Sequence, residues 1–174
     1  TTLPTPTNPM PTTPAATTDG TGLDVDLAVV TVKACDTDVA ARDLATGDVG
    51  AAVSLQNGLG NEDRLAAGLR CPVVAGTTTH GAMLSEPGVV AWTGRGTVTV
   101  GNWRVDGGDA ATDPAGDDPA AQIAAAFRAA SVDVAVDPDI RRRLWLKLAV
   151  NAAINPTTAL ARVRNGAVCS EPIA

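Results

Sequence analysis

From Leu23 onward, short apolar runs rich in β-branched residues alternate with segments of helical character. The run Asp26–Val32 is almost continuously apolar, and Asp36 stands where its side chain can cap a following helix. A strand without polar alternation is typical of a parallel sheet covered on both faces. We therefore expect strands at 26–32, 51–55 and 73–76, with helices at 36–45 and 61–69. This β-α-β-α-β order predicts an α/β sheet with right-handed crossovers.

The second half of the chain changes pattern. The runs Val89–Trp92 and Thr97–Val100 flank a turn-like segment, Thr93–Gly96, which predicts an antiparallel hairpin. Asp118 and Pro119 are typical of a helix start. The other expected elements are a polar loop at 104–116, a helix at 118–130, a strand at 132–136 and a helix from 137 through 154, with Pro156 near its end.

Composition narrows the classes of partner. The net charge of −6 opposes nucleic-acid binding, which needs clustered Lys and Arg. No apolar run reaches the length of a membrane span, and the N-terminus has neither the basic nor the apolar region of a signal peptide. Cys35, Cys71 and Cys169 show no metal-binding spacing, so we expect free thiols and no metal. The expected protein is cytoplasmic and binds neither nucleic acid nor membrane.

Lysine is nearly absent, since Lys33 and Lys147 stand against 11 arginines. An acidic excess with little lysine is typical either of a high-salt cytoplasm, as in halophiles, or of a GC-rich genome. A lysine that remains in such a composition is more often needed for its ammonium group. Both lysines are therefore candidates for a functional role.

The segment Leu144–Asn155 has three strongly polar side chains, Lys147, Asn151 and Asn155, spaced in steps of four. On a helix they form one stripe, and the otherwise apolar circumference predicts burial. One interpretation is that the stripe is a structural polar seam or a chance pattern. The other is that it is a row of hydrogen-bond donors facing a cleft. In the latter case Lys147 could protonate a carbonyl oxygen as hydride reaches the carbon, while the amides orient the substrate.

Two further segments follow predicted strands. Gln56–Gly60 stands where ligands bind in open α/β sheets, and its glycines allow close backbone approach, although an ordinary strand-to-helix turn is the simpler interpretation of this segment alone. Thr77–Ala82 contains a lone histidine, His80. No Asp or Cys spacing suggests a triad or a metal site around it, so a structural role is the simpler interpretation.

Taken together, these motifs resemble the ketopantoate reductase (2-dehydropantoate 2-reductase) family. The resemblance runs in order from Asp24 to Pro172. It is carried by the segments 31–34, 54–62, 76–82, 86–88, 92–96, 144–160 and 165–166.

The resemblance implies reduction of ketopantoate to pantoate with NADPH, on the route to pantothenate and coenzyme A. It implies that Lys147 is the general acid. It also implies substrate contacts from Asn151, Asn155 and Asn165, and cofactor-side positions for Asn57, Gly58 and Lys33. The partner would be a small 2-oxo acid, and the complete enzyme could be a homodimer. A related 2-oxo acid reductase and a non-catalytic remnant or interaction module are the alternatives.

The implied fold is a Rossmann-type dinucleotide-binding domain followed by an all-helical C-terminal domain, with the cleft between them. The family opens with a strand and a Gly-x-Gly-x-x-Gly turn, and nothing before Leu23 resembles it. The family's later helices, which carry a serine and a glutamate, would follow Ala174. We therefore expect a truncated chain with a disordered Thr/Pro-rich tail at 1–22, a partial Rossmann-type domain at 23–137 and the first helices of the C-terminal domain at 138–174.

Overall fold

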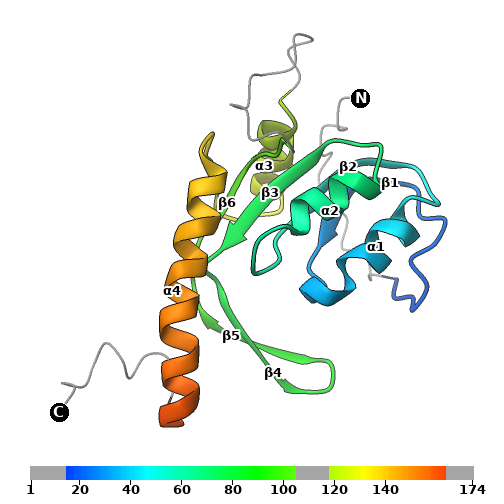
Figure 1. The fold of residues 1–174 in the computed structure, drawn as a ribbon. Coiled ribbons are helices and arrows are strands. Elements are labelled where there is room, and N and C mark those ends of the chain that lie inside the picture. Colours follow the sequence, from blue (N-terminus) through cyan, green and yellow to red (C-terminus); the bar gives the residue numbers. More distant parts are fainter. Residues whose placement is uncertain (1–14, 105–117, 164–174) are drawn as a thin grey trace.

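The structure is a computed structural model that describes residues 15–104 and 118–163. Its centre is a five-stranded sheet in the order β1-β2-β3-β6-β7 (Figure 1). β1, β2 and β3 are parallel, β6 runs antiparallel to β3, and β7 is parallel to β6. The bounds are β1 Val25–Val30, β2 Val49–Ser54, β3 Val73–Thr78, β6 Val98–Asn102 and β7 Val134–Val136.

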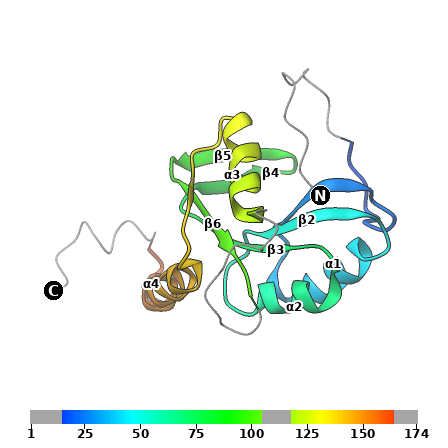
Figure 2. The same cartoon turned by 90° about the horizontal axis from the view of Figure 1, so that it is seen from above.

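Helices cover both faces of this sheet (Figure 2). α1 (Thr37–Leu44) and α2 (Asn61–Gly68) lie on one face, and α3 (Pro119–Ala129) lies on the other. α1 follows a short 3-10 turn at Ala34–Asp36. The predicted α/β class and the parallel β1-β2-β3 order are thus confirmed.

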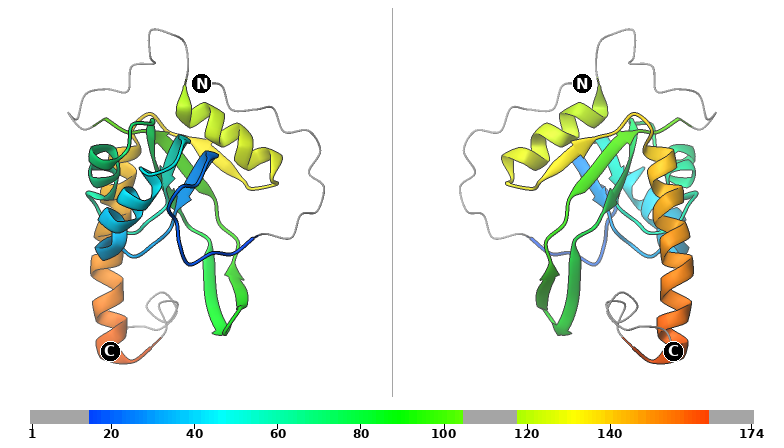
Figure 3. Two further views of the ribbon diagram at one scale, coloured as in Figure 1. Left: turned by 90° about the vertical axis from the view of Figure 1, so that its right-hand side faces the viewer. Right: turned by 90° about the vertical axis from the view of Figure 1, so that its left-hand side faces the viewer.

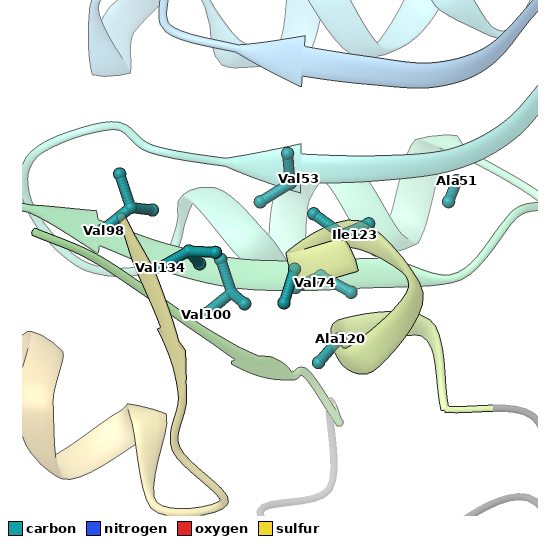
Figure 4. Packing of buried hydrophobic residues seen from close by; sticks show 9 residues of the cluster. Ala51, Val53, Val74, Val98, Val100, Ala120, Ile123 and Val134 are labelled. Carbon is teal, nitrogen blue, oxygen red and sulfur yellow. The ribbon is translucent and has the colours of Figure 1, made fainter. Parts of the chain in front are cut away.

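Each face of the sheet has its own core. Under α3, Val53, Val74 and Val100 pack with Ile123 and Ala120, and all five are fully buried (Figure 4). On the opposite face, a second buried cluster joins the sheet to α1 and α2 through Ala28, Val30, Ala41, Ala52, Leu65, Leu69 and Val73. The alternation of side chains along each strand supplies one set of residues to each core.

The two helix caps expected from the sequence behave differently. The Asp118 side chain accepts a hydrogen bond from the Ala121 N–H, with Pro119 at the first helical position, as predicted. Asp36 precedes α1, but its side chain makes no capping hydrogen bond, so that prediction was wrong. The 3-10 turn places the Thr37 hydroxyl on the Ala34 carbonyl instead.

β1 is buried on one face and only partly covered on the other, where Leu27 packs against the core under α3, against the expectation of two covered faces. Ala28 and Val30 are buried, whereas Val25 and Val29 are 36% and 45% exposed. In the described part of the chain, no helix lies over Val25 and Val29, and β1 forms one edge of the sheet. The apolar run predicted the strand correctly, but it did not predict how far other elements bury each of its two faces.

The antiparallel hairpin does not lie where the pattern placed it. It consists of β4 (Gly81–Glu86) and β5 (Val89–Gly94), joined at Pro87 and Gly88. Gly88 has φ 80°, a conformation that glycine adopts without strain. The predicted second hairpin strand at 97–100 instead enters the main sheet as β6, where it pairs with β3. Both pairings are antiparallel, so strand pattern alone did not distinguish them.

The long helix α4 (Ile140–Ala161) begins against the sheet and then extends past it in the same direction as the β4–β5 hairpin (Figures 1 and 3). Ile140 and Leu144 pack on Ala75, with Leu59 and Trp103 around them. A Cβ at Gly101 would overlap the Asp137 carbonyl oxygen and Ile140, so glycine permits this close approach. The expectation of a buried helix was wrong for its outer part, because Trp145 and Val150 are more than half exposed.

α4 also starts three residues later than predicted and continues past Pro156 to Ala161. β7 is shorter than the predicted strand at 132–136. Residues 15–22 contain no helix or strand. The rest of the predicted tail and most of the predicted loop at 104–116 lie outside the described residues. The domain boundaries after residues 22 and 137 stay predictions.

Candidate active site

A cleft of about 760 Å³ lies where the end of β3 meets α4. Four parts of the chain supply its polar lining: the segment after β2, the end of β3, β6 and α4. The polar lining residues are Asn57, Thr77, Thr78, Thr79, His80, Thr97, Thr99, Arg143, Lys147, Asn151 and Asn155. The cleft thus collects hydroxyl, amide, imidazole and cationic groups, and no carboxylate lines it among the described residues.

Lys147 is the central cation of this cleft. Its Nζ donates a hydrogen bond to the Thr78 carbonyl oxygen at 3.0 Å. Burial lowers the pKa of the Lys147 ammonium below its ordinary value, and no carboxylate pairs with it in the described residues. An ammonium that is partly desolvated gives up its proton more readily, which suits a general acid.

Asn151 and Asn155 line the same cleft as Lys147. The steps of four along α4 therefore do form one polar stripe, as the spacing predicted. The stripe lines the cleft, and whether its role is structural or catalytic stays a prediction.

Asn57 reaches the cleft from the turn after β2. Gly58 and Gly60 have φ 98° and 82°, so this turn needs two residues without a Cβ. Beneath it, the buried Gln56 side chain donates to the Val32 carbonyl at 3.0 Å and to the Thr37 hydroxyl at 2.9 Å. The Asn57 carbonyl accepts a hydrogen bond from Asn61 Nδ2 at 3.2 Å. These bonds fix the turn and leave the Asn57 side chain on the cleft wall.

The other predicted site residues are not brought into the cleft. Lys33 is exposed after β1 and is not part of the lining, and neither is Gly58. Asn165 lies outside the described residues. The structure therefore groups Asn57, Lys147, Asn151 and Asn155, and no observation tests the individual roles expected for the seven residues.

Several lining residues were not singled out from the sequence. Thr77 and Thr99 lie opposite each other in the β3–β6 pairing, and the buried Thr77 Oγ1 has no hydrogen-bond partner in the described residues. Thr99 was not predicted as a site residue because its strand was assigned to the hairpin and not to the main sheet. Arg143 also lines the cleft, and it pairs with Asp137 at 2.6 Å. That hydrogen bond lowers the pKa of the Asp137 carboxyl.

The cysteines and acidic residues add no second centre within the described ranges. Cys35 and Cys71 are free thiols, as expected, and burial raises the pKa of Cys71. Cys169 lies outside the described residues. No group of His, Cys, Asp or Glu in residues 15–104 and 118–163 could hold a metal ion. No described helix is both long and apolar enough to cross a membrane.

The parallel β1-β2-β3 unit, its covering helices and a cleft beyond the ends of the strands define a partial Rossmann-type α/β fold. Comparison with known proteins agrees. The family model described as ketopantoate reductase PanE/ApbA matches residues 4–105, so its match begins inside the Thr/Pro-rich segment. The model for the C-terminal part of that family matches residues 139–174. The chain therefore belongs to the ketopantoate reductase family.

Individual relatives support the same assignment. The chain is 43% identical over 151 residues to the 2-dehydropantoate 2-reductase of Archaeoglobus fulgidus, covering 86% of this chain and 47% of the relative. It is 44% identical to that of Halobacterium salinarum, again over 86% of this chain and 47% of the relative. The chain thus spans about half the length of the curated relatives it matches.

Solved structures of the family share the fold. The PanE/ApbA family ketopantoate reductase from Ralstonia eutropha matches with a TM-score of 0.65 and 30% identity, covering 82% of this chain and 43% of that chain. The 2-dehydropantoate 2-reductase from Geobacter metallireducens matches with a TM-score of 0.65 and 29% identity, covering 80% of this chain and 44% of that chain.

Proposed function

We propose that this chain supplies the lysine-bearing half of an NADPH-dependent 2-dehydropantoate 2-reductase, which reduces ketopantoate to pantoate for pantothenate and coenzyme A synthesis. The observation that carries the proposal is Lys147, half-buried in the cleft and held by the Thr78 carbonyl at 3.0 Å. The names of the relatives at up to 44% identity support the substrate. The proposed location is the cytoplasm.

The reaction converts a ketone into an alcohol by adding hydride to carbon and a proton to oxygen. As negative charge develops on the oxygen, the Lys147 ammonium stabilises it and then transfers its proton there. The Thr78 carbonyl fixes the position of Nζ, and the lowered pKa of Lys147 makes its proton easier to transfer. Asn151, Asn155 and the Asn57 side chain orient the carboxylate and hydroxyl groups from the cleft walls.

The residues present fit one end of the cofactor. The strand-end turn at Gln56–Gly60, with two positive-φ glycines, offers close backbone approach beside Asn57. NADPH would supply the hydride at this end of the cleft. The glycine-rich turn that binds pyrophosphate at a helix N-terminus does not occur in this sequence. The chain by itself should therefore bind NADPH weakly.

The acidic composition supports two further parts of the proposal, the absence of a nucleic-acid partner and a high-salt cytoplasm. A net charge of −6 with two lysines disfavours nucleic acid as a partner and suits a high-salt cytoplasm. A relative from Halobacterium salinarum is consistent with that setting.

A chimera tests the proposed function. The 151 aligned residues of this chain would replace the matching part of the Halobacterium salinarum relative, so that both ends are supplied. Turnover would be followed by the loss of NADPH absorbance with ketopantoate. Lys147→Ala should lower turnover by about 10²–10⁴-fold while NADPH affinity stays nearly unchanged. Lys147→Arg should not restore turnover, because guanidinium retains its proton and has a different shape.

Arg142→Ala is the matched control. Arg142 is exposed on the same helix, carries the same charge and is not part of the cleft lining. It should leave turnover unchanged. Near-wild-type turnover in Lys147→Ala would show that the polar stripe is structural.

A further inference from the structure

The His80 side chain is held in one orientation on the cleft wall. Its Nδ1 accepts a hydrogen bond from the Gly96 N–H at 3.1 Å, and its ring packs against Trp92 with centroids 5.4 Å apart. Gly96 lies so close to the backbone of Thr79 and His80 that a Cβ there would overlap both. The ring is therefore fixed at the junction between the main sheet and the β4–β5 hairpin.

This arrangement uses only one of the two ring nitrogens. Because Nδ1 accepts a backbone N–H, the neutral ring carries its proton on Nε2. Nε2 makes no hydrogen bond with any residue of the ranges 15–104 and 118–163. His80 is part of the cleft lining. His80 Nε2 is not among the buried atoms that lack a partner, so its N–H is accessible and can donate to a molecule in the cleft.

Thr78 connects His80 to Lys147. The Thr78 hydroxyl accepts a hydrogen bond from the His80 backbone N–H at 3.1 Å, and its carbonyl accepts one from Lys147 Nζ at 3.0 Å. One residue at the end of β3 thus bonds to the ammonium of Lys147 and to the backbone of His80. A 2-oxo acid carries a carbonyl oxygen and a carboxylate, which offer more acceptors than one ammonium can satisfy.

We propose that His80 is a substrate-binding residue whose Nε2–H donates a hydrogen bond to an oxygen of the 2-oxo acid held at Lys147. This inference rests on the proposed function. It replaces the structural interpretation of His80 with a functional one. Nδ1 accepts the Gly96 N–H and fixes the ring, and Nε2–H donates to the substrate.

NMR of the purified, untagged chain can measure the tautomer of the His80 ring and its response to ligand. His80 is the single histidine of the sequence, so its ring signals need no assignment. Long-range ¹H–¹⁵N correlation of the imidazole should show the Nε2–H tautomer before any ligand is added. Titration with ketopantoate, at constant ionic strength, should shift the His80 ring signals saturably. The same titration with chloride alone should not shift them.

Two variants separate the roles of the two nitrogens. His80→Asn places a carbonyl oxygen near Nδ1, which keeps an acceptor for Gly96 and removes the Nε2 donor. His80→Gln places an amide N–H near Nε2. Losing one neutral hydrogen bond should weaken ketopantoate binding by about 3- to 10-fold in His80→Asn. His80→Gln should bind more tightly than His80→Asn. Tryptophan fluorescence would verify that both variants fold like the wild type.

Lys147→Met distinguishes failure of this inference from failure of the proposed function. Binding that needs Lys147 but is equal in wild type and His80→Asn would overturn the role of His80 alone. Binding that needs His80 but not Lys147 would overturn the proposed role of Lys147. An Nδ1–H tautomer, or unshifted His80 signals with saturating ketopantoate, would also refute the His80 assignment. Absence of any ketopantoate binding to the wild-type chain would overturn the His80 assignment, whereas the proposed function is tested separately by the turnover of the chimera.

Discussion

Glu62 is a carboxyl group in an unfavourable place. It is the second residue of α2, its side chain is fully buried, and neither carboxyl oxygen has a hydrogen-bond partner among the described residues. Burial raises the pKa of the Glu62 carboxyl. Replacing it by glutamine keeps the shape and removes the charge. Glu62→Gln should therefore stabilise the fold at neutral pH.

The magnitude follows from the unpaired oxygens. A buried acceptor without a partner costs about 1–3 kcal/mol, and more when it is charged. Glutamine still buries a polar group, so only the part due to charge is recovered. We expect Glu62→Gln to raise the free energy of unfolding by about 1–2 kcal/mol at neutral pH.

The pH dependence has a definite sign. The folded-state pKa of Glu62 lies above that of the unfolded chain, so the folded state binds more protons in the interval between the two values. The free energy of unfolding of the wild type should therefore fall as pH rises through that interval, which starts near the ordinary glutamate pKa of about 4.3. Below it, wild type and Glu62→Gln should have similar stabilities.

Urea unfolding followed by tryptophan fluorescence measures this difference. Trp103 is a suitable probe, because its indole N–H donates to Asp63, the residue after Glu62, at 2.8 Å. Glu86→Gln is the matched control, since Glu86 is an exposed glutamate on β4. If Glu62→Gln is no more stable than Glu86→Gln at neutral pH, or if its advantage persists on acidification, the argument from an uncompensated buried charge is wrong.

Two further predictions concern Lys147 and the hairpin. With ¹³C-methylated lysines, the Lys147 signal, identified by its loss in Lys147→Arg, should titrate below the ordinary lysine value of about 10.4. Since the unfolded state then binds more protons, this group makes stability rise with pH between its folded and unfolded pKa, and a midpoint at or above 10.4 would contradict its burial. Leu84 and Val90 are 67% and 66% exposed on the β4–β5 hairpin. Because exposed apolar side chains promote association, Leu84→Lys should reduce self-association of the chain, measured by sedimentation velocity. The control Ser85→Lys should not reduce it. Equal self-association in both variants would exclude this apolar surface as the cause.

The sequence predicted the local elements closely where the signal was local. β-branched apolar runs gave β2 and β3 within two residues, and the Asp118–Pro119 pair gave the start of α3. The hairpin was misplaced because Thr93–Gly96 and Pro87–Gly88 both look like turns. Which strand pairs with 98–102 depends on hydrogen bonds to β3, about twenty residues earlier, and a local pattern does not contain that information.

For the candidate site too, some features follow from the sequence and others only from the tertiary structure. The sequence by itself determined that Lys147, Asn151 and Asn155 share one stripe, because a helix of fixed pitch brings every fourth residue to one side. It also indicated a turn with close backbone approach at Gly58 and Gly60, and the structure shows that both glycines adopt positive φ angles there. Only the tertiary structure decided that this stripe faces the end of β3, that Thr78 holds both Lys147 and His80, and that Lys33 stays outside the cleft. Those facts depend on how α4, β3 and β6 pack against one another, and packing between distant segments is set by the fold as a whole.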